Sequence, residues 1–260
     1  TPLYSSAASD VYKRQVSKEY LSIEDARKNK LKVDFEENKP FKPNKLGVFT
    51  HQTTVSELKD FIDWTPFFKT WDLHGKFPAI LDDEIVGTNA KELYVDALSM
   101  LNKIETENLA KPKAVFGLFK ANTVNDDTIE LFDENDNKIE EFYTLRQQAK
   151  KSKEQPNISI ADFIAPKDSE IQDYIGAFAV TAGQEIEEIA KAYETNLDDY
   201  NSIMVKAIAD RLAEAYAEYL HKYVRTEVWG YAKDETLSND ELISEKYKGI
   251  RPAPGYPACP

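Results

Sequence analysis

A central block of strand-type sequence lies between two helical blocks in this chain of 260 residues. The segments 114–122, 128–133 and 139–145 are short and rich in β-branched and aromatic residues, and the sequence ENDNK separates the last two as a hairpin turn would. The segments 159–166 and 173–183 have the same strand-like character. Helices followed by a cluster of strands and then by helices predict an α+β fold and argue against a βαβ array.

Helical patterns make up the two flanking blocks. Ser22, Asp198 and Ser238 are placed as N-caps, and Glu241 completes a capping box with Ser238. A connector at 35–47 carries Pro and Lys residues between the first two helices. Apolar residues recur at helical spacing in the expected helices, which cover 20–30, 53–64, 81–109, 184–195, 198–232 and 237–247.

Residues 1–15 differ from the rest of the chain. They lack the apolar core of a signal peptide and do not blend with the regular sequence that starts at Val16. We therefore expect 1–15 to be a disordered leader or a stray peptide and 16–260 to form a single domain. Since 42% of the residues are hydrophobic, a core of that size can be filled.

The charge balance restricts the partners. Acids outnumber bases 46 to 33, which gives a net charge of −13, so the surface should repel nucleic acid and anionic membranes. Small molecules, or proteins with a basic or neutral patch, are the expected partners. No apolar run approaches the ~20 residues of a membrane-spanning helix. The single cysteine, Cys259, rules out an intrachain disulfide and fits a reducing cytoplasm.

Several common catalytic motifs are absent from the sequence. It contains no GxGxxG, no P-loop and no GxSxG, and its three histidines lack the spacing of metal ligands. We expect no metal site and no catalytic acid or base, so any reactive group should come from a bound ligand.

An aromatic cluster, FIDWTPFFKTW at 61–71, surrounds the single acid Asp63. One interpretation is a buried cluster in which Asp63 caps the turn that Pro66 opens. The other is a carboxylate at the rim of an apolar pocket, suited to a ligand ammonium group. The spacing leaves both open.

A second candidate segment, RLAEAYAEYLHKYV, aligns Arg211, Glu214, Glu218 and His221 along one helical stripe. Neighbours three and four residues apart on a helix form weak ion pairs. Taken alone, the stripe is therefore interpreted as a solvated face with Arg–Glu pairs.

The segment GIRPAPGYPACP at 249–260 contains four prolines. Because proline fixes φ and lacks an N–H group, the segment should be a rigid extended strand whose remaining main-chain groups can bind a flat polar ring. Gly255 would permit close approach, Tyr256 offers a stacking face, and Arg251 offers a fork for a carboxylate. The alternative is a tail packed along the domain with Arg251 in a salt bridge.

These residues occur within a longer resemblance. From about Val16 to the end, the chain resembles the C-terminal activation domain of cobalamin-dependent methionine synthases. The strings that carry the resemblance are IDWTPFF, GLFKAN, LRQQ, ADFIAPK, DYIGAFAVTAG, DDYNSIMVKAIADRLAEAYAEYLH, WGYA, LSNDELI and GIRPAPGYPACP.

The resemblance implies a single α+β domain, curved into a C-like shape around a twisted antiparallel sheet flanked by helices, that binds S-adenosylmethionine. In the whole enzyme, cobalamin carries a methyl group from methyltetrahydrofolate to homocysteine and is occasionally oxidised to inactive cob(II)alamin. Flavodoxin or an equivalent reductase then supplies an electron, and S-adenosylmethionine remethylates the cobalt. The cobalamin domain, and the homocysteine domain with its zinc, are expected outside this sequence.

Site residues follow from the same resemblance. Asp63 matches the family acid on the methionine ammonium, and Arg251 matches the arginine on its carboxylate. The main chain of Ala253, Gly255 and Tyr256 matches the contacts to adenine and ribose.

Two acids, Glu214 and Glu245, match family acids near the same ligand.

Because the sulfonium is a good leaving group and cob(I)alamin is a strong nucleophile, the domain is expected to act by aiming the methyl group at the cobalt.

Family members continue past PACP through further sheet and helix with a tyrosine pair at the ligand site, so the 260 residues are expected to be incomplete at their C-terminus.

Two other functions stay open. One is a free-standing S-adenosylmethionine-dependent methyltransferase that acts on a small molecule. The other is a flavodoxin-docking module without a ligand, whose basic patch would be formed by Lys111, Lys113, Lys120, Lys150, Lys151 and Lys153.

Overall fold

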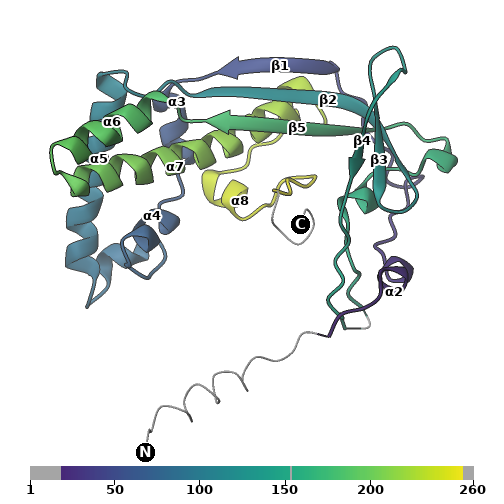
Figure 1. The fold of residues 1–260 in the computed structure, drawn as a ribbon, viewed down its shortest axis with the longest axis horizontal. Coiled ribbons are helices and arrows are strands. Elements are labelled where there is room, and N and C mark those ends of the chain that lie inside the picture. Colours follow the sequence, from purple (N-terminus) through teal and green to yellow (C-terminus); the bar gives the residue numbers. More distant parts are fainter. Residues whose placement is uncertain (1–18, 153, 254–260) are drawn as a thin grey trace, which may run out of the picture. The chain divides into compact units, whose positions relative to one another are not determined.

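The computed structural model describes residues 19–152 and 154–253 (Figure 1). The chain divides into two compact units. Unit 1 comprises Thr1–Pro40, Lys120–Tyr174 and Arg251–Pro260, and unit 2 comprises Phe41–Phe119 and Ile175–Ile250.

A five-stranded sheet confirms the α+β fold. Its strands follow the order β1-β2-β3-β4, and β5 pairs with β2. The pairs β1–β2, β2–β3 and β3–β4 are antiparallel, with Gly47 opposite Leu118 and Lys120 opposite Phe132. The strands are β1 (Gly47–Gln52), β2 (Lys113–Val124), β3 (Thr128–Phe132), β4 (Lys138–Tyr143) and β5 (Asp173–Thr181).

Two strand assignments differ from the sequence-based expectation. Strand β1 was not anticipated, although its side chains alternate between half-buried and exposed positions, and Phe49 stacks on Phe116 of β2 with ring centroids 5.2 Å apart. The expected strand at 159–166 is wrong, because Ile160–Phe163 forms a 3₁₀ turn. Ser159 and Asp162 close a capping box there, and these local bonds compete with an extended backbone.

The helices largely follow the predicted pattern. Ser22, Asp198 and Ser238 are confirmed as N-caps, and Glu241 closes its capping box. The helices are α2 (Ile23–Lys28), α3 (Val55–Leu58), α4 (Thr65–Thr70), α5 (Gly87–Thr106), α6 (Glu185–Thr195), α7 (Asp199–Tyr223) and α8 (Asn239–Ile243). The 3₁₀ turns outside 160–163 are Lys59–Phe61, Ala79–Asp82 and Lys167–Ser169.

Two helices are shorter than their apolar patterns. Helix α5 starts only at Gly87, because Asp83 accepts hydrogen bonds from the amides of Ile85 and Val86 and holds a turn before it. The expected helix at 198–232 ends as α7 at Tyr223 and continues as a π-helical turn, Val224–Val228. π-Turns inside helices are rare and often occur at functional sites.

The core of unit 2 is apolar and aromatic. Helix α7 contributes Leu212 and Tyr216, neither of which is exposed, and the helices α5, α6 and α7 lie side by side in Figure 1. The aromatic cluster at 61–71 is largely buried, as one of the two interpretations predicted, with Trp64 edge-on to Phe67 at 5.4 Å. Each fully buried large apolar side chain contributes ~1.5–3 kcal/mol, so this cluster fixes the loop that carries Asp63.

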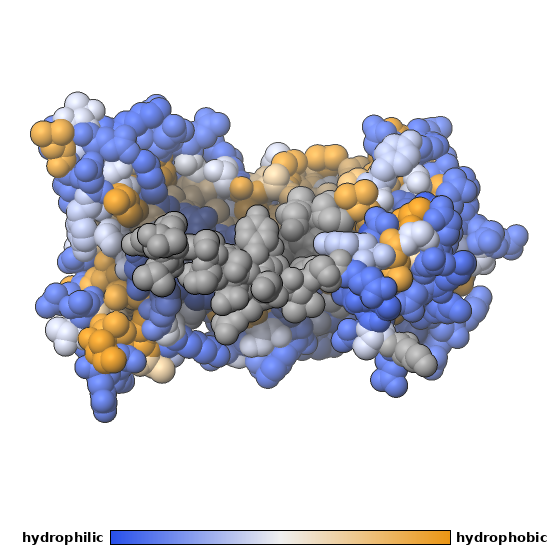
Figure 2. All heavy atoms as spheres, turned by 60° about the horizontal axis from the view of Figure 1, so that its bottom comes forward, coloured by the Kyte–Doolittle hydropathy of each residue, from blue (hydrophilic) through white to orange (hydrophobic). Residues whose placement is uncertain are grey.

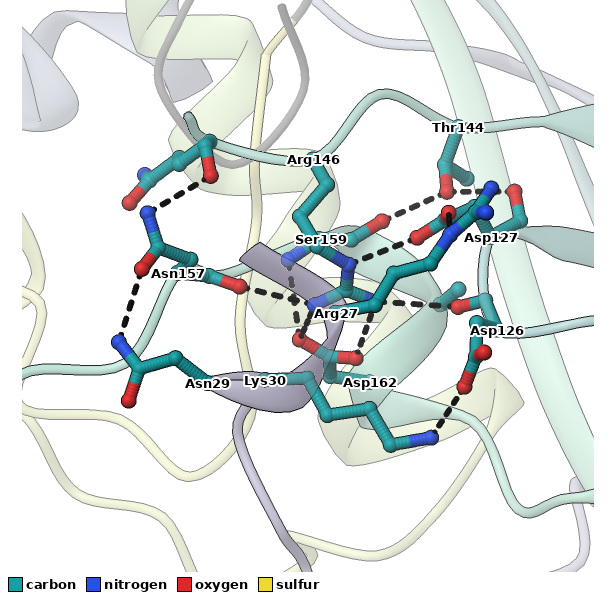
Figure 3. Close-up of polar contacts among 12 residues, drawn as sticks. Arg27, Asn29, Lys30, Asp126, Asp127, Thr144, Arg146, Asn157, Ser159 and Asp162 are labelled. Carbon is teal, nitrogen blue, oxygen red and sulfur yellow. Dashed lines mark hydrogen bonds and ion pairs between the residues drawn. The ribbon is translucent and has the colours of Figure 1, made fainter. Parts of the chain in front are cut away.

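The centre of unit 1 is polar (Figure 3). Arg146, whose side chain is fully buried, donates Nε to Asp127 at 2.8 Å and its two terminal nitrogens to Asp162 at 2.7 and 2.8 Å. The carbonyls of Asp126 and Asn157 accept the remaining N–H groups. All five guanidinium donors are thus satisfied, as a buried charge requires.

The same network secures helix α2 and its neighbours in unit 1. Arg27 donates to Asp127 at 2.7 Å, and Lys30 donates to Asp126 at 2.5 Å. The Asn29 amide donates to the side-chain oxygen of Asn157 at 2.8 Å. Figure 3 shows these side chains converging from α2 and from the segments that follow β2 and β4.

The face of the molecule drawn in Figure 2 is largely hydrophilic. Hydrophilic residues cover most of the coloured area in Figure 2, and hydrophobic residues form small groups among them. Among the residues that the structure describes, no helix is both long and apolar enough to cross a membrane.

Candidate functional site

Asp63 lies in the loop before α4 and is half-buried. Its Oδ1 accepts a hydrogen bond from the amide of Thr65 at 2.9 Å, which forms an Asx-type turn just before α4; the N-cap of α4 itself is Trp64, without a side-chain capping bond. The Thr65 hydroxyl in turn accepts from the amide of Phe77 at 3.2 Å. Oδ2 of Asp63 has no hydrogen-bond partner among the described residues, so one carboxylate oxygen is held and the other stays available.

The stripe on α7 differs from the solvated face that its spacing predicted. Glu214 is exposed, but Arg211 pairs with Asp210 at 2.5 Å rather than with a glutamate of the stripe. His221 is buried at 8% exposure, and the ring of Tyr247 meets it edge-on at 4.7 Å. The interpretation as a solvated face is therefore wrong at His221, because Tyr247, far along the chain, covers this end of the helix, and the expected Arg–Glu pair of Arg211 is replaced by its pair with Asp210; Glu214 is exposed as predicted.

Glu245 follows α8 and is exposed. It has a φ of 55°, in the left-handed region, and its amide donates to the carbonyl of Leu242 at 2.9 Å. A left-handed residue just beyond a helix redirects the chain. Glu245 thus marks the turn that directs the chain toward Arg251.

The proline-rich segment begins at the edge of the described residues. Arg251 is half-buried and Ala253 is exposed, and neither belongs to a helix or a strand. The predicted contacts of Gly255 and Tyr256 lie outside the described residues. The structure thus places Asp63, Glu214 and Glu245 in unit 2 and Arg251 in unit 1, and no hydrogen bond or ion pair joins the first three to one another within the described chain.

A buried cluster in unit 2 was missed by the sequence analysis. Arg225, in the π-turn, is fully buried and forms a double hydrogen bond with Glu235 at 2.5 and 3.0 Å. Tyr247 stacks on the Arg225 guanidinium, and burial raises the pKa of the neighbouring Tyr231 to about 12. The only signal in the sequence was the placement of Arg225 on the buried side of a long helical pattern.

The described residues contain no group of three or more His, Cys, Asp or Glu side chains that could hold a metal ion. Some of their titratable groups serve as helix caps, as at Glu241, whose pKa is lowered mainly by the amide of Ser238. Asp63 presents a half-buried carboxylate in unit 2, and Arg251 presents a half-buried guanidinium in unit 1; the roles predicted for them, on an ammonium and on a carboxylate, stay predictions.

Comparisons with known proteins give the family. A structure described as the MetH reactivation domain bound to AdoHcy superposes with a TM-score of 0.87 and shares 52% sequence identity, covering 93% of this chain and 74% of the other. The family model for the activation domain of vitamin B12-dependent methionine synthase matches residues 54–260. The chain therefore belongs to the activation-domain family of vitamin B12-dependent methionine synthases.

Proposed function

We propose that this chain binds S-adenosylmethionine and presents its methyl group to cobalamin, so that an oxidised methionine synthase returns to its active form. The observation that carries the proposal is the similarity to a reactivation domain bound to AdoHcy, at 52% identity over 93% of this chain. AdoHcy is the demethylated form of S-adenosylmethionine, so a site that holds one has the shape and the polar groups to hold the other.

The ligand contacts belong to the proposal as well. The free oxygen of Asp63 would accept from the methionine ammonium, and the Arg251 guanidinium would donate to the methionine carboxylate. The main chain of Ala253, Gly255 and Tyr256 would bind adenine and ribose. Opposite charges at the two ends of an amino acid give both recognition and a fixed orientation.

Glu214 and Glu245 are proposed to lie near the same ligand. Both are exposed, so they can approach it without first losing a partner in the described part of the chain.

S-Adenosylmethionine would supply an electrophilic methyl group on its sulfonium. Cobalamin, once reduced from the cob(II) to the cob(I) state by one electron from flavodoxin or an equivalent reductase, would accept that methyl group, and AdoHcy would leave. This chain then needs only to bind and orient the ligand. Cobalamin would be held by a neighbouring domain of the same cytoplasmic enzyme, whose complete reaction transfers a methyl group from methyltetrahydrofolate to homocysteine. Zinc would belong to the homocysteine domain alone.

Calorimetric titration with S-adenosylmethionine and with AdoHcy tests the proposal. Arg251→Ala should weaken binding by ~1.5–3 kcal/mol, because a hydrogen bond to a charged group is lost. Lys248→Ala is the matched control, since it removes an exposed cation three positions earlier in the same segment. An undetectable affinity of the unmodified chain for both ligands would refute the proposal, and an unchanged affinity of Arg251→Ala would remove Arg251 from the site.

Three of the six lysines that would form the basic patch of the docking alternative are paired with acids. Lys111 pairs with Glu185 at 3.5 Å, and Lys120 pairs with Asp136 at 2.6 Å. Lys150 is likewise paired, and Lys153 lies outside the described residues. A free-standing methyltransferase would instead be supported by methyl transfer to a small acceptor in the absence of cobalamin.

A further inference from the structure

The buried residues His221, Arg225, Glu235 and Tyr247 of unit 2 form what we call the Tyr247 platform. Arg225 is completely buried, and the side chain of Glu235 is 7% exposed. The two side chains face each other fork to fork, with Nε to Oε2 at 3.0 Å and Nη2 to Oε1 at 2.5 Å. A bidentate pair fixes the plane of the guanidinium as well as its position.

The ring of Tyr247 rests on this fixed plane. Its centroid lies 4.3 Å from the central guanidinium carbon of Arg225, and the His221 ring meets it at a right angle, 4.7 Å away. Tyr247 is 8% exposed, although its neighbours Lys246 and Lys248 are exposed. One ring thus anchors an otherwise exposed stretch of chain.

The π-turn explains how the pair is assembled. The Arg225 carbonyl accepts hydrogen bonds from the amides of Gly230 and Ala232, both at 3.1 Å, so the chain folds back over the end of the helix. The amide of Glu235 then donates to the Ala232 carbonyl at 3.0 Å, which brings its carboxylate to Arg225. A buried ion pair adds little net stability compared with apolar residues. What this pair adds is a fixed position and plane for the Arg225 guanidinium, which apolar side chains would not provide.

A second contact holds the next residues. The Tyr231 hydroxyl donates to the Lys248 carbonyl at 3.2 Å. Gly249 has a φ of 103°, and a Cβ atom added there would lie 2.9 Å from the Tyr231 hydroxyl oxygen. Tyr247 is therefore held by its ring, and Lys248 is held by the hydrogen bond to its carbonyl. At Gly249 the Tyr231 hydroxyl leaves no room for a side chain.

We propose that the Tyr247 platform is a positioning device for the ligand-binding strand, and that its members act through Arg251 without touching the ligand. The inference rests on the proposed function of that strand. Arg251 follows Tyr247 by four residues, so the chain between them spans at most about 14 Å. With Tyr247 and Lys248 fixed, the chain that leads to Arg251 starts from one anchored point, and the ordering cost of binding falls.

The test compares Tyr247→Leu with Tyr247→Phe, which keeps the ring on Arg225 and against His221. Tyr247→Leu should weaken AdoHcy binding about tenfold at a temperature at which circular dichroism shows both variants fully folded, because a displaced anchor misplaces the guanidinium that follows it. Tyr247→Phe should retain most of the affinity. Equal losses in the two variants would overturn the role of the ring.

A double-mutant cycle separates positioning from general loosening. If the platform acts through Arg251, Tyr247→Leu should cost little further affinity in an Arg251→Ala background. Fully additive losses would overturn the inference.

Hydrogen exchange of the amides at 248–253 tests the platform without any ligand. Exchange there should accelerate in Tyr247→Leu and stay near the original rate in Tyr247→Phe. Unchanged exchange in Tyr247→Leu would overturn the platform even if AdoHcy binds. Faster exchange in a chain that fails to bind AdoHcy would refute the proposed function and leave the anchoring intact.

Discussion

Asp162→Asn should strongly destabilise the polar centre of unit 1. The Asp162 carboxylate is 1% exposed, and it accepts two hydrogen bonds from Arg146 and one from the amide of Ser159 at 3.0 Å. Asparagine keeps the shape but offers a single oxygen. Its amide N–H₂ group would therefore face either a guanidinium donor or the Ser159 amide.

The size of the stability loss depends on which charge partners Arg146 keeps after the substitution. Breaking a buried pair by removing one partner costs about 3–5 kcal/mol, because the other charge stays buried. Asp127 still faces Nε of Arg146 at 2.8 Å and compensates part of that charge, so we expect the lower end, about 3 kcal/mol. Against a total stability of about 5–15 kcal/mol, this is a large loss.

Urea unfolding followed by far-ultraviolet circular dichroism measures the loss. For a urea dependence of about 1–3 kcal/mol per molar, the midpoint should fall by roughly 1–3 M. Tryptophan fluorescence is a poor probe for this variant, because Trp64, Trp71 and Trp229 all belong to unit 2. The matched control is Asp168→Asn, which makes the same change at an exposed residue of unit 1 with no hydrogen bond to a described residue.

A free energy of unfolding within about 0.5 kcal/mol of the original for Asp162→Asn would refute this reasoning, because that is the range of an ordinary surface substitution. An equal loss in Asp168→Asn would show that net charge, and not the buried pair, is responsible.

Two further predictions concern unit 2. Burial lowers the pKa of His51, whose Nδ1 lies 2.9 Å from the Tyr216 hydroxyl oxygen, so the folded state binds the proton less readily than the unfolded state does. The free energy of unfolding should therefore fall as the pH drops through about 6.5 and level off below the pKa of His51 in the folded state. Urea midpoints that depend on pH as strongly in His51→Gln as in the original chain would contradict this. Leu212→Ala, at a side chain with no exposure, should cost about 2–5 kcal/mol, whereas Leu197→Ala, at 91% exposure, should stay within about 0.5 kcal/mol; comparable urea midpoints for the two variants would contradict the assigned core.

Local signals in the sequence predicted much of the secondary structure correctly. The N-caps at Ser22, Asp198 and Ser238 depend on side chains within three residues of the helix start, so the sequence alone identifies them. The strand expected at 159–166 failed because the capping box of Ser159 and Asp162 was overlooked beside the apolar residues of that segment. Strand β1 was missed because its pairing with β2 is a long-range contact that a short segment does not reveal.

The sequence by itself determined most of the helices, the α+β class, the acidic character and the resemblance that the comparisons confirmed, because these depend on residue type and on neighbours along the chain. Only the tertiary structure decided the environment of individual side chains. It showed that His221 is buried although the other stripe residues are not, and that Arg146 gathers acids from separate segments. It also showed that Tyr247 rests on Arg225. Burial and charge pairing depend on what folds over a residue, and in each case that partner lies beyond the reach of a local pattern.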